Sequence, residues 1–236
     1  MDPLWRGQPN GEWRLVAPSM RAKFVAAVQF AKIGQPVRID GHISVEQLNH
    51  FKYLATGLPG LDTRGMTDDD WAALARHNGL TSNLLDWSGS PFVAAFFAYS
   101  AALNDANDGA IQSGRLPHGP ILSPSGQVAI WRMGAHAGLW EPGVFELLSS
   151  LSPINFWQKA QKGCFTRLSH AEHIDVGSYL YAKDNLSSLT RFLLPAHEAL
   201  QVLAELERMN ITYATLLPDL QGAARQANLA AALRPF

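Results

Sequence analysis

A polar run beside a strongly apolar helical segment constrains this 236-residue chain more than any other feature. The polar run extends from His77 to Pro91, and the apolar segment follows directly, from Phe92 to Tyr99. Polar side chains packed against such a segment are at least partly buried, and a buried polar group without a partner costs about 1–3 kcal/mol. We therefore expect the two titratable residues of the run, His77 and Asp86, to have structural or functional partners.

Two interpretations of this run stay open. In the first, Asp86 or Ser88 is the N-cap of the next helix, because their side-chain oxygens can accept a free backbone N–H. In the second, the same helix start faces a ligand, because Pro91 marks the first turn of a helix and helix N-termini bind anions. His77 lies near the end of the preceding predicted helix, where the dipole favours a charged imidazolium; it is either a C-terminal cap or a catalyst.

The composition favours a packed protein without a membrane segment. Hydrophobic residues make up 47% of the chain and charged residues 17%. The net charge of −1 gives no overall attraction to nucleic acid or to a membrane, although it allows a local basic groove. The single cysteine, Cys164, excludes an intrachain disulfide and a cysteine-based zinc site. No apolar run of about 18 residues and no signal-peptide pattern occur, so we expect a cytoplasmic protein without membrane contact.

Hydrophobic periodicity predicts an α+β fold in one domain, residues 1–236, with a helix-rich first half and a mostly antiparallel mixed sheet. The predicted strands are 4–8, 127–133, 163–168 and 189–195. Residues 12–18 are a short strand or an extended segment, 146–151 a strand or a short helix, and 211–216 are β-rich. The predicted helices are 19–33, 44–56, 67–78, 90–103, 196–210 and a final one after 219. Residues 104–126 are predicted to be a long loop or insertion.

Three further side chains have both a functional and an ordinary structural interpretation. Arg6, followed by Gly7, can fork onto a carboxylate or phosphate, or it can form a surface salt bridge. Trp87 and Trp131 can stack on a base or a nicotinamide ring, or they can belong to the core.

Known site motifs are otherwise absent. His170 and His173, near Glu172 and Asp175, indicate a solvated surface rather than a metal site. The sequence contains no phosphate-binding glycine loop, no Gly-x-Ser-x-Gly and no dinucleotide-binding glycine pattern.

Several of these residues resemble the motifs of the FRG domain, a bacterial and phage family named for a Phe/Tyr-Arg-Gly sequence. Trp5-Arg6-Gly7 matches that sequence, and residues 77–98, with Leu-Leu-Asp-Trp-Ser at 84–88, resemble the family's most diagnostic motif. Residues 155–165 fit a later Asn-x-Arg-x-x-x-Gln-x-Gly-x-Phe pattern, and 217–220 fit a Pro-Asp-Leu signature. The resemblance therefore extends in order over nearly the whole chain.

Two positions depart from the family pattern. The arginine that usually precedes Leu-Leu-Asp-Trp is Asn83 here, and the arginine of the later pattern is Trp157. Two positive charges are therefore missing where the resemblance would place them, which weakens a phosphate-binding role carried over from the family.

A more distant resemblance is to mono-ADP-ribosyltransferases of the Arg-Ser-Glu class. These open with an aromatic-Arg-Gly strand, continue with a Ser-Thr-Ser strand before an Ala-x-x-Phe-Ala helix, and end with a glutamate strand. Arg6, residues 86–90 and residues 94–98 are similar to the first two elements, but the glutamate region holds Gln158 and Gln161. By this resemblance, either Asp86 supplies the negative charge that stabilises an oxocarbenium ion, or the site binds without ADP-ribosyl transfer.

The resemblance implies NAD as a substrate and one shared pocket without a metal. Its catalytic candidates are Asp86, His77 and Gln161. Its NAD-binding candidates are Arg6, which would hold the phosphate or a ribose, Ser88, which would position the nicotinamide ribose, and Gln8, Asn83 and Trp87.

We expect an NAD-dependent, ADP-ribosyltransferase-like toxin or anti-phage defence effector that modifies a nucleic acid or protein, with an antitoxin or regulatory partner. The alternative is a non-catalytic module that recognises a nucleotide or a phage component and signals through a partner. Hydrolysis of a nucleotide or nucleic acid is disfavoured, because the sequence shows no carboxylate cluster for magnesium. A shared pocket requires Arg6, His77, Asp86 and Gln161 to converge on one cleft.

Overall fold

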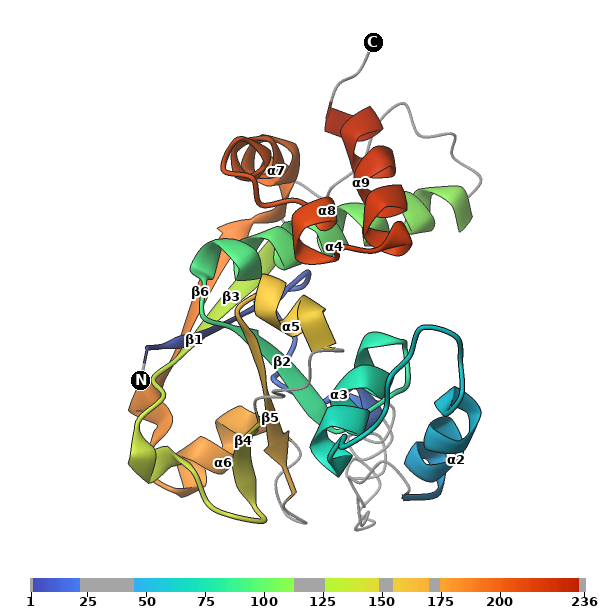
Figure 1. Cartoon of the computed structure of the whole chain (residues 1–236). Helices are drawn as coiled ribbons and strands as arrows, with labels where there is room; N and C mark the ends of the chain where they lie inside the picture. The colour runs from blue at the N-terminus through green and yellow to red at the C-terminus, as the bar shows by residue number, and fades with distance from the viewer. Residues whose placement is uncertain (1, 22–44, 113–125, 149–154, 170–174, 234–236) are drawn as a thin grey trace.

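Two strands from the first half of the chain form the centre of a six-stranded sheet (Figure 1). The computed structural model describes residues 2–21, 45–112, 126–148, 155–169 and 175–233. The sheet has the order β4-β5-β2-β1-β3-β6, and every pair is antiparallel. Its strands are β1 (Leu4–Gln8), β2 (Leu84–Ser88), β3 (Gln127–Met133), β4 (Phe145–Leu148), β5 (Gly163–Leu168) and β6 (Leu189–Pro195).

Helices lie at both ends and on both faces of this sheet. They are α2 (Val45–Ala55), α3 (Asp68–His77), α4 (Pro91–Gln112), α5 (Phe156–Ala160), α6 (Val176–Ala182), α7 (Ala199–Arg208), α8 (Tyr213–Leu216) and α9 (Leu220–Leu233). Short 3-10 turns in the described part of the chain include Ala137–Leu139, Leu186–Ser188 and Ala196–Glu198. Figure 1 shows α4, α7, α8 and α9 together at the top, with α6 at the lower left and α2 and α3 at the lower right. The α+β class is confirmed.

The buried apolar side chains form three clusters, and alternation along the strands separates the two largest. One contains Phe96, Tyr99 and Leu103 of α4 with side chains of α7, α8, α9 and β3. The other contains Leu85 and Trp87 of β2 with side chains of α6, β4 and residues 15–20. The strand β2 therefore has one apolar face, while its other face, with Asp86 and Ser88, remains available for polar contacts.

A close backbone approach joins β1 to α4. A Cβ atom at Gly7 would lie 1.9 Å from the carbonyl oxygen of Ala94 and 2.8 Å from the amide nitrogen of Ala98. Only a residue without a side chain fits there. Gly7 belongs to the Trp5-Arg6-Gly7 motif, and Ala94 and Ala98 belong to the motif at 77–98. This close contact therefore gives a physical reason for small residues in both motifs.

Most predicted strands and helices are confirmed, including β1, β3, β5 and β6 with the predicted bounds. The prediction of a helix at 19–33 falls mostly outside the described residues; the described part is helical from 18 to 21. Residues 12–18 contain no strand.

Three local predictions are wrong. Asp86 and Ser88 belong to β2, and the residue that caps α4 is Ser90, whose Oγ accepts the Val93 N–H at 3.4 Å. Residues 104–112 continue α4 rather than opening a loop, and 113–125 lie outside the described residues. The β-rich segment 211–216 contains the helix α8 (Tyr213–Leu216) instead of a strand, because the hydroxyls of Thr212 and Thr215 make a reciprocal capping box that starts a helix.

Candidate functional site

A gap between the two central strands holds Arg6. β1 and β2 share a single register pair, Trp5↔Ser88, whereas β1 and β3 pair along all of β1. Arg6 reaches into this gap and donates from Nη1 to the backbone oxygen of Asp86 at 2.6 Å and to its carboxylate Oδ2 at 3.3 Å. The arginine side chain is only 9% exposed, so its charge needs the carboxylate beside it.

A second arginine binds the same carboxylate oxygen. Arg76, in the last turn of α3, donates from Nη2 to Asp86 Oδ2 at 2.9 Å. Burial disfavours a charged Asp86, but the positive charges of Arg76 and Arg6 outweigh it, and the pKa of Asp86 lies below its ordinary value. Asp86 is thus a carboxylate at neutral pH, 43% exposed and held between two guanidinium groups.

A cleft of about 350 Å³ opens over this ion cluster. Arg6, Arg76, His77 and Asp86 form its polar wall, and Arg225 of α9 lines it as well. Its remaining lining is mixed, and comprises Trp5, Gly7, Pro9, Trp87, Ser88, Ala94, Phe97, Ala101, Gln161, Leu217 and Gln221. Asp86 is the only carboxylate among these described lining residues, so the cleft is positively charged and has an apolar side.

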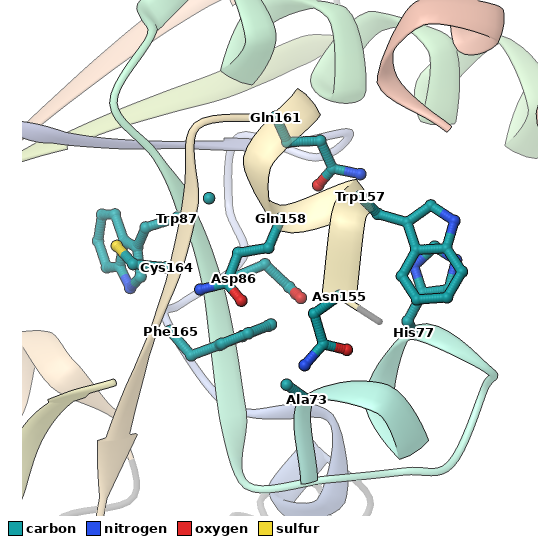
Figure 2. A pocket seen from close by; sticks show the side chains of 11 residues that line it. Ala73, His77, Asp86, Trp87, Asn155, Trp157, Gln158, Gln161, Cys164 and Phe165 are labelled. Carbon is teal, nitrogen blue, oxygen red and sulfur yellow. The ribbon is translucent and has the colours of Figure 1, made fainter. Parts of the chain in front are cut away.

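A smaller cavity of about 50 Å³ adjoins the cleft (Figure 2). His77, Asp86, Trp87 and Gln161 line both spaces. Figure 2 shows Gln158 and Asp86 pointing into this cavity, with Phe165 below them. The two spaces therefore meet at the carboxylate of Asp86.

His77 joins the cleft to the C-terminal helices. Its ring stacks on Trp157, with ring centroids 3.7 Å apart, and its Nε2 lies 3.7 Å from Asp219 Oδ2. Asp219 also accepts the Trp157 Nε1–H at 3.0 Å and the Gly222 N–H at 2.7 Å, which makes it the N-cap of α9. The Asp of the Pro-Asp-Leu signature therefore ties α9 to α3 and α5.

The structure favours a neutral His77, whereas the helix dipole favours the charged form. Burial lowers the pKa of His77, and Asp219 offsets that effect only in part. The imidazole is thus mostly neutral at pH 7, in contrast to the charged form predicted from the helix dipole. The residue that caps α3 is Asn78, whose amide donates to the Leu74 oxygen at 2.9 Å.

Ser88 and Gln161 fix the turns on either side of the cleft. The Ser88 Oγ–H donates to the backbone oxygen of Gln161 at 2.7 Å, and the same Oγ accepts the Ser90 N–H at 3.0 Å. The Gln161 amide donates to the Leu216 oxygen of α8 at 3.0 Å. Both residues line the cleft, and both already have protein partners there.

The structure brings together Arg6, His77, Asp86, Ser88 and Gln161, as a shared pocket requires. Gln8 and Asn83 do not line either cavity. Gln8 is buried between the Arg14 oxygen and the Trp131 indole, where it is a structural residue.

The ring of Trp87 is also a structural group. It packs in the core cluster with Leu85 and donates from Nε1 to Thr166 Oγ1 at 2.9 Å. Residues Leu85 and Trp87 point to the face of β2 opposite to Asp86, so only part of Trp87 borders the cleft. It cannot stack on a ligand there without leaving the core.

Sequence reasoning missed two arginines of the cleft. Arg76 directly precedes His77 in the last turn of a correctly predicted helix, and this adjacency to a predicted site residue could have identified it. Arg225 had none, because it reaches the cleft through the placement of α9. Arg76 and Arg225 thus give the cleft positive charge even though positions 83 and 157 hold Asn and Trp instead of arginine.

Other chemistry finds little support in the described part of the chain. Burial raises the pKa of Cys164 to about 12, so its thiol is not a nucleophile at neutral pH. The described residues contain no group of three or more metal-ligating side chains, and His170 and His173 lie outside them. None of the described helices is long and apolar enough to cross a membrane.

Comparison with known protein families supports one of the two resemblances. Residues 2–107 match the FRG domain. This match covers β1, α3 and β2, and with them Arg6, Arg76, His77 and Asp86. No curated protein and no solved structure matches the chain. The FRG relationship is therefore supported, and the ADP-ribosyltransferase resemblance is not.

Proposed function

We propose that the cleft binds a phosphorylated nucleotide, with NAD as its leading candidate. The observation that carries this proposal is the convergence of Arg6, Arg76 and Arg225 on a single cavity. Asp86 offsets one of the three charges and His77 is mostly neutral at pH 7, so the cleft retains about two positive charges. A pyrophosphate diester such as that of NAD carries two negative charges.

The size and lining of the cleft agree with such a ligand. A volume of about 350 Å³ lies within the range of small-molecule sites, roughly 300–1,000 Å³. Guanidinium groups bind phosphate oxygens in pairs, and the side formed by Ala94, Phe97 and Leu217 suits a base or a sugar.

Binding can be tested by calorimetry with NAD and ADP-ribose. Arg76→Ala and Arg225→Ala should each weaken the affinity by about 10- to 100-fold, as expected for one lost charged hydrogen bond of about 1.5–3 kcal/mol. Arg208→Ala is the matched control, because it removes an exposed arginine outside the cleft. Equal losses in all three variants, or no binding to the unmodified protein, would refute the proposal.

ADP-ribosyl transfer is a second candidate, and one feature of Asp86 favours it. Both arginines bind Oδ2, and no hydrogen bond reaches Oδ1 within the described part of the chain. In such a reaction the bond between the ribose C1′ and nicotinamide breaks, nicotinamide leaves with the electron pair, and an acceptor oxygen or nitrogen bonds to C1′ and loses a proton. Asp86 would stabilise the positive charge that develops on the ribose.

Labelled NAD with cell lysate separates transfer from binding alone. Transfer predicts label on a nucleic acid or protein, or free nicotinamide, and its loss in Asp86→Asn. Binding without label transfer or NAD loss would favour a recognition module that signals through a partner. A toxin or defence effector under the control of an antitoxin is the biological setting that we propose for the transferring form.

A further inference from the structure

The small cavity presents a different kind of polar group from the cleft. The cleft offers guanidinium donors, whereas the cavity is lined by side chains that can accept. Asp86 contributes Oδ1, because its ion pairs occupy Oδ2. Asp86 lines both spaces, and Oδ1 is the carboxylate oxygen that the arginines leave available to a ligand.

Gln158 adds a second acceptor to this cavity. Its Oε1 atom is buried and has no hydrogen-bond partner in the described structure. Figure 2 shows the Gln158 amide directed into the same space as the Asp86 carboxylate. An unpaired buried acceptor costs about 1–3 kcal/mol, and a ligand that donates to it removes that cost.

The size of the cavity limits the group that can enter. A volume of about 50 Å³ holds a few water molecules, since each needs roughly 10–15 Å³. A primary amide or an amine fits this space, whereas a whole aromatic ring needs a cavity closer to about 150 Å³. The entering group must therefore project from a ligand that lies mainly in the cleft.

We infer that the small cavity is a subsite for a neutral N–H donor group of the bound ligand, such as a primary amide, and that Gln158 Oε1 is its specificity-determining acceptor. The inference rests on the proposed nucleotide binding and adds a rule to it. A ligand with a phosphate end and an amide end should bind better than the same ligand with a carboxylate in place of the amide. A carboxylate has no N–H to donate, and it would lie beside the charge of Asp86.

Calorimetry with three probes tests this rule: NAD, the analogue with a nicotinic acid in place of nicotinamide, and ADP-ribose. The unmodified protein should bind NAD about 10-fold more tightly than the acid analogue, the equivalent of one hydrogen bond of about 1.4 kcal/mol. Gln158→Leu should reduce that preference, because only the repulsion between Asp86 and the carboxylate of the acid analogue remains. It should leave the affinity for ADP-ribose unchanged, because ADP-ribose has no amide to place in the cavity. Gln158→Glu keeps an acceptor oxygen and should keep the preference.

Gln201→Leu is the matched control, because Gln201 is an exposed residue of α7 that lines neither the cleft nor the small cavity. It should retain the preference for NAD. If ADP-ribose binds and Gln158→Leu retains the 10-fold preference, the subsite inference is wrong while the proposed function stands. If neither NAD nor ADP-ribose binds to the unmodified protein, both are wrong.

Discussion

At the level of single residues, the central contact of the cleft is Asp86, because two arginines bind it. Arg6 is buried, and within the described part of the chain both of its hydrogen bonds are to Asp86, one to the backbone and one to the carboxylate. Arg76 comes from another element and binds the same oxygen. Removing one partner of such a pair leaves the other charge poorly solvated, which usually costs more than the pair itself contributes.

The first prediction concerns Asp86→Asn. The amide keeps the shape of the side chain and leaves two arginines without a counter-charge. We expect unfolding to be easier by about 1–3 kcal/mol at pH 7, below the cost of a fully buried pair because Asp86 is 43% exposed. Urea denaturation followed by tryptophan fluorescence measures the difference.

The pH dependence of that difference has a defined sign. The pKa of Asp86 is lowered in the folded protein, so its stabilising effect is full above the unfolded value of about 3.9 and is lost as the pH falls through the folded value. The gap between the unmodified protein and Asp86→Asn should therefore be constant from pH 7 to 5 and close below about pH 4. A gap that stays constant in acid would contradict the ion-pair assignment.

The second prediction concerns the protonation of His77. Its pKa is lowered by burial, so the unfolded chain takes up the proton first and stability falls as the pH drops below about 6.5. His77→Phe keeps a ring that can stack on Trp157 and removes the titration. Between pH 7.5 and 5.5 the free energy of unfolding should fall less in this variant than in the unmodified protein. Equal losses would show that His77 is not buried in its neutral form.

At the scale of elements, the packing of β1 on α4 depends on one glycine. The backbone of α4 lies so close to Gly7 that a methyl group would overlap Ala94 and Ala98. Both contacts are to backbone atoms, which cannot move without displacing the helix. This packing also sets the position of Arg6, the neighbour of Gly7, relative to β2.

The third prediction compares two glycine substitutions. Gly7→Ala should cost more than about 3 kcal/mol, beyond the usual 1–3 kcal/mol for overpacking, or should prevent soluble expression. Gly89→Ala is the control, because a Cβ there would lie 3.7 Å from its nearest neighbours, an ordinary contact. Thermal unfolding should show a large loss for the first variant and little change for the second. Similar melting temperatures would rule out the close approach.

At the scale of the whole molecule, the sheet is built from both halves of the chain. The family match ends at residue 107, and it includes β1 and β2 but none of the other strands. Those two strands share one register pair, while their long pairings are to β3 and β5. Gln161 and Arg225 of the cleft also lie beyond the match.

The fourth prediction is that residues 1–112 do not fold alone. This fragment ends with α4 and leaves β1 and β2 without their outer neighbours, so its backbone groups and apolar faces stay unpaired. Circular dichroism should show no cooperative unfolding for the fragment, in contrast to the full chain. Mixing it with residues 113–236 under refolding conditions should restore part of the signal. A cooperative transition of the isolated fragment would contradict this picture.

Local sequence signals were sufficient to predict several helices and strands. The apolar runs in 127–133 and 189–195 and the Thr67 start of α3 predicted elements that the structure confirms. The polar run at 77–91 also identified one part of the cleft, His77, Asp86, Trp87 and Ser88, because buried polar groups beside an apolar helix need partners. The prediction from local signals was wrong at 211–216, where β-branched residues favour a strand but a capping box begins a helix.

The contacts of Asp86 depend on long-range packing. The sequence allowed a helix cap or a ligand-facing residue; the sheet order instead places it in a central strand, beside a gap filled by a residue 80 positions away. Arg225 enters the cleft because Asp219 fixes the start of α9 against His77 and Trp157. Charges that meet through such long-range packing leave no periodic pattern in the sequence, and for that reason the polar run revealed a site but not the arginines that give it its charge.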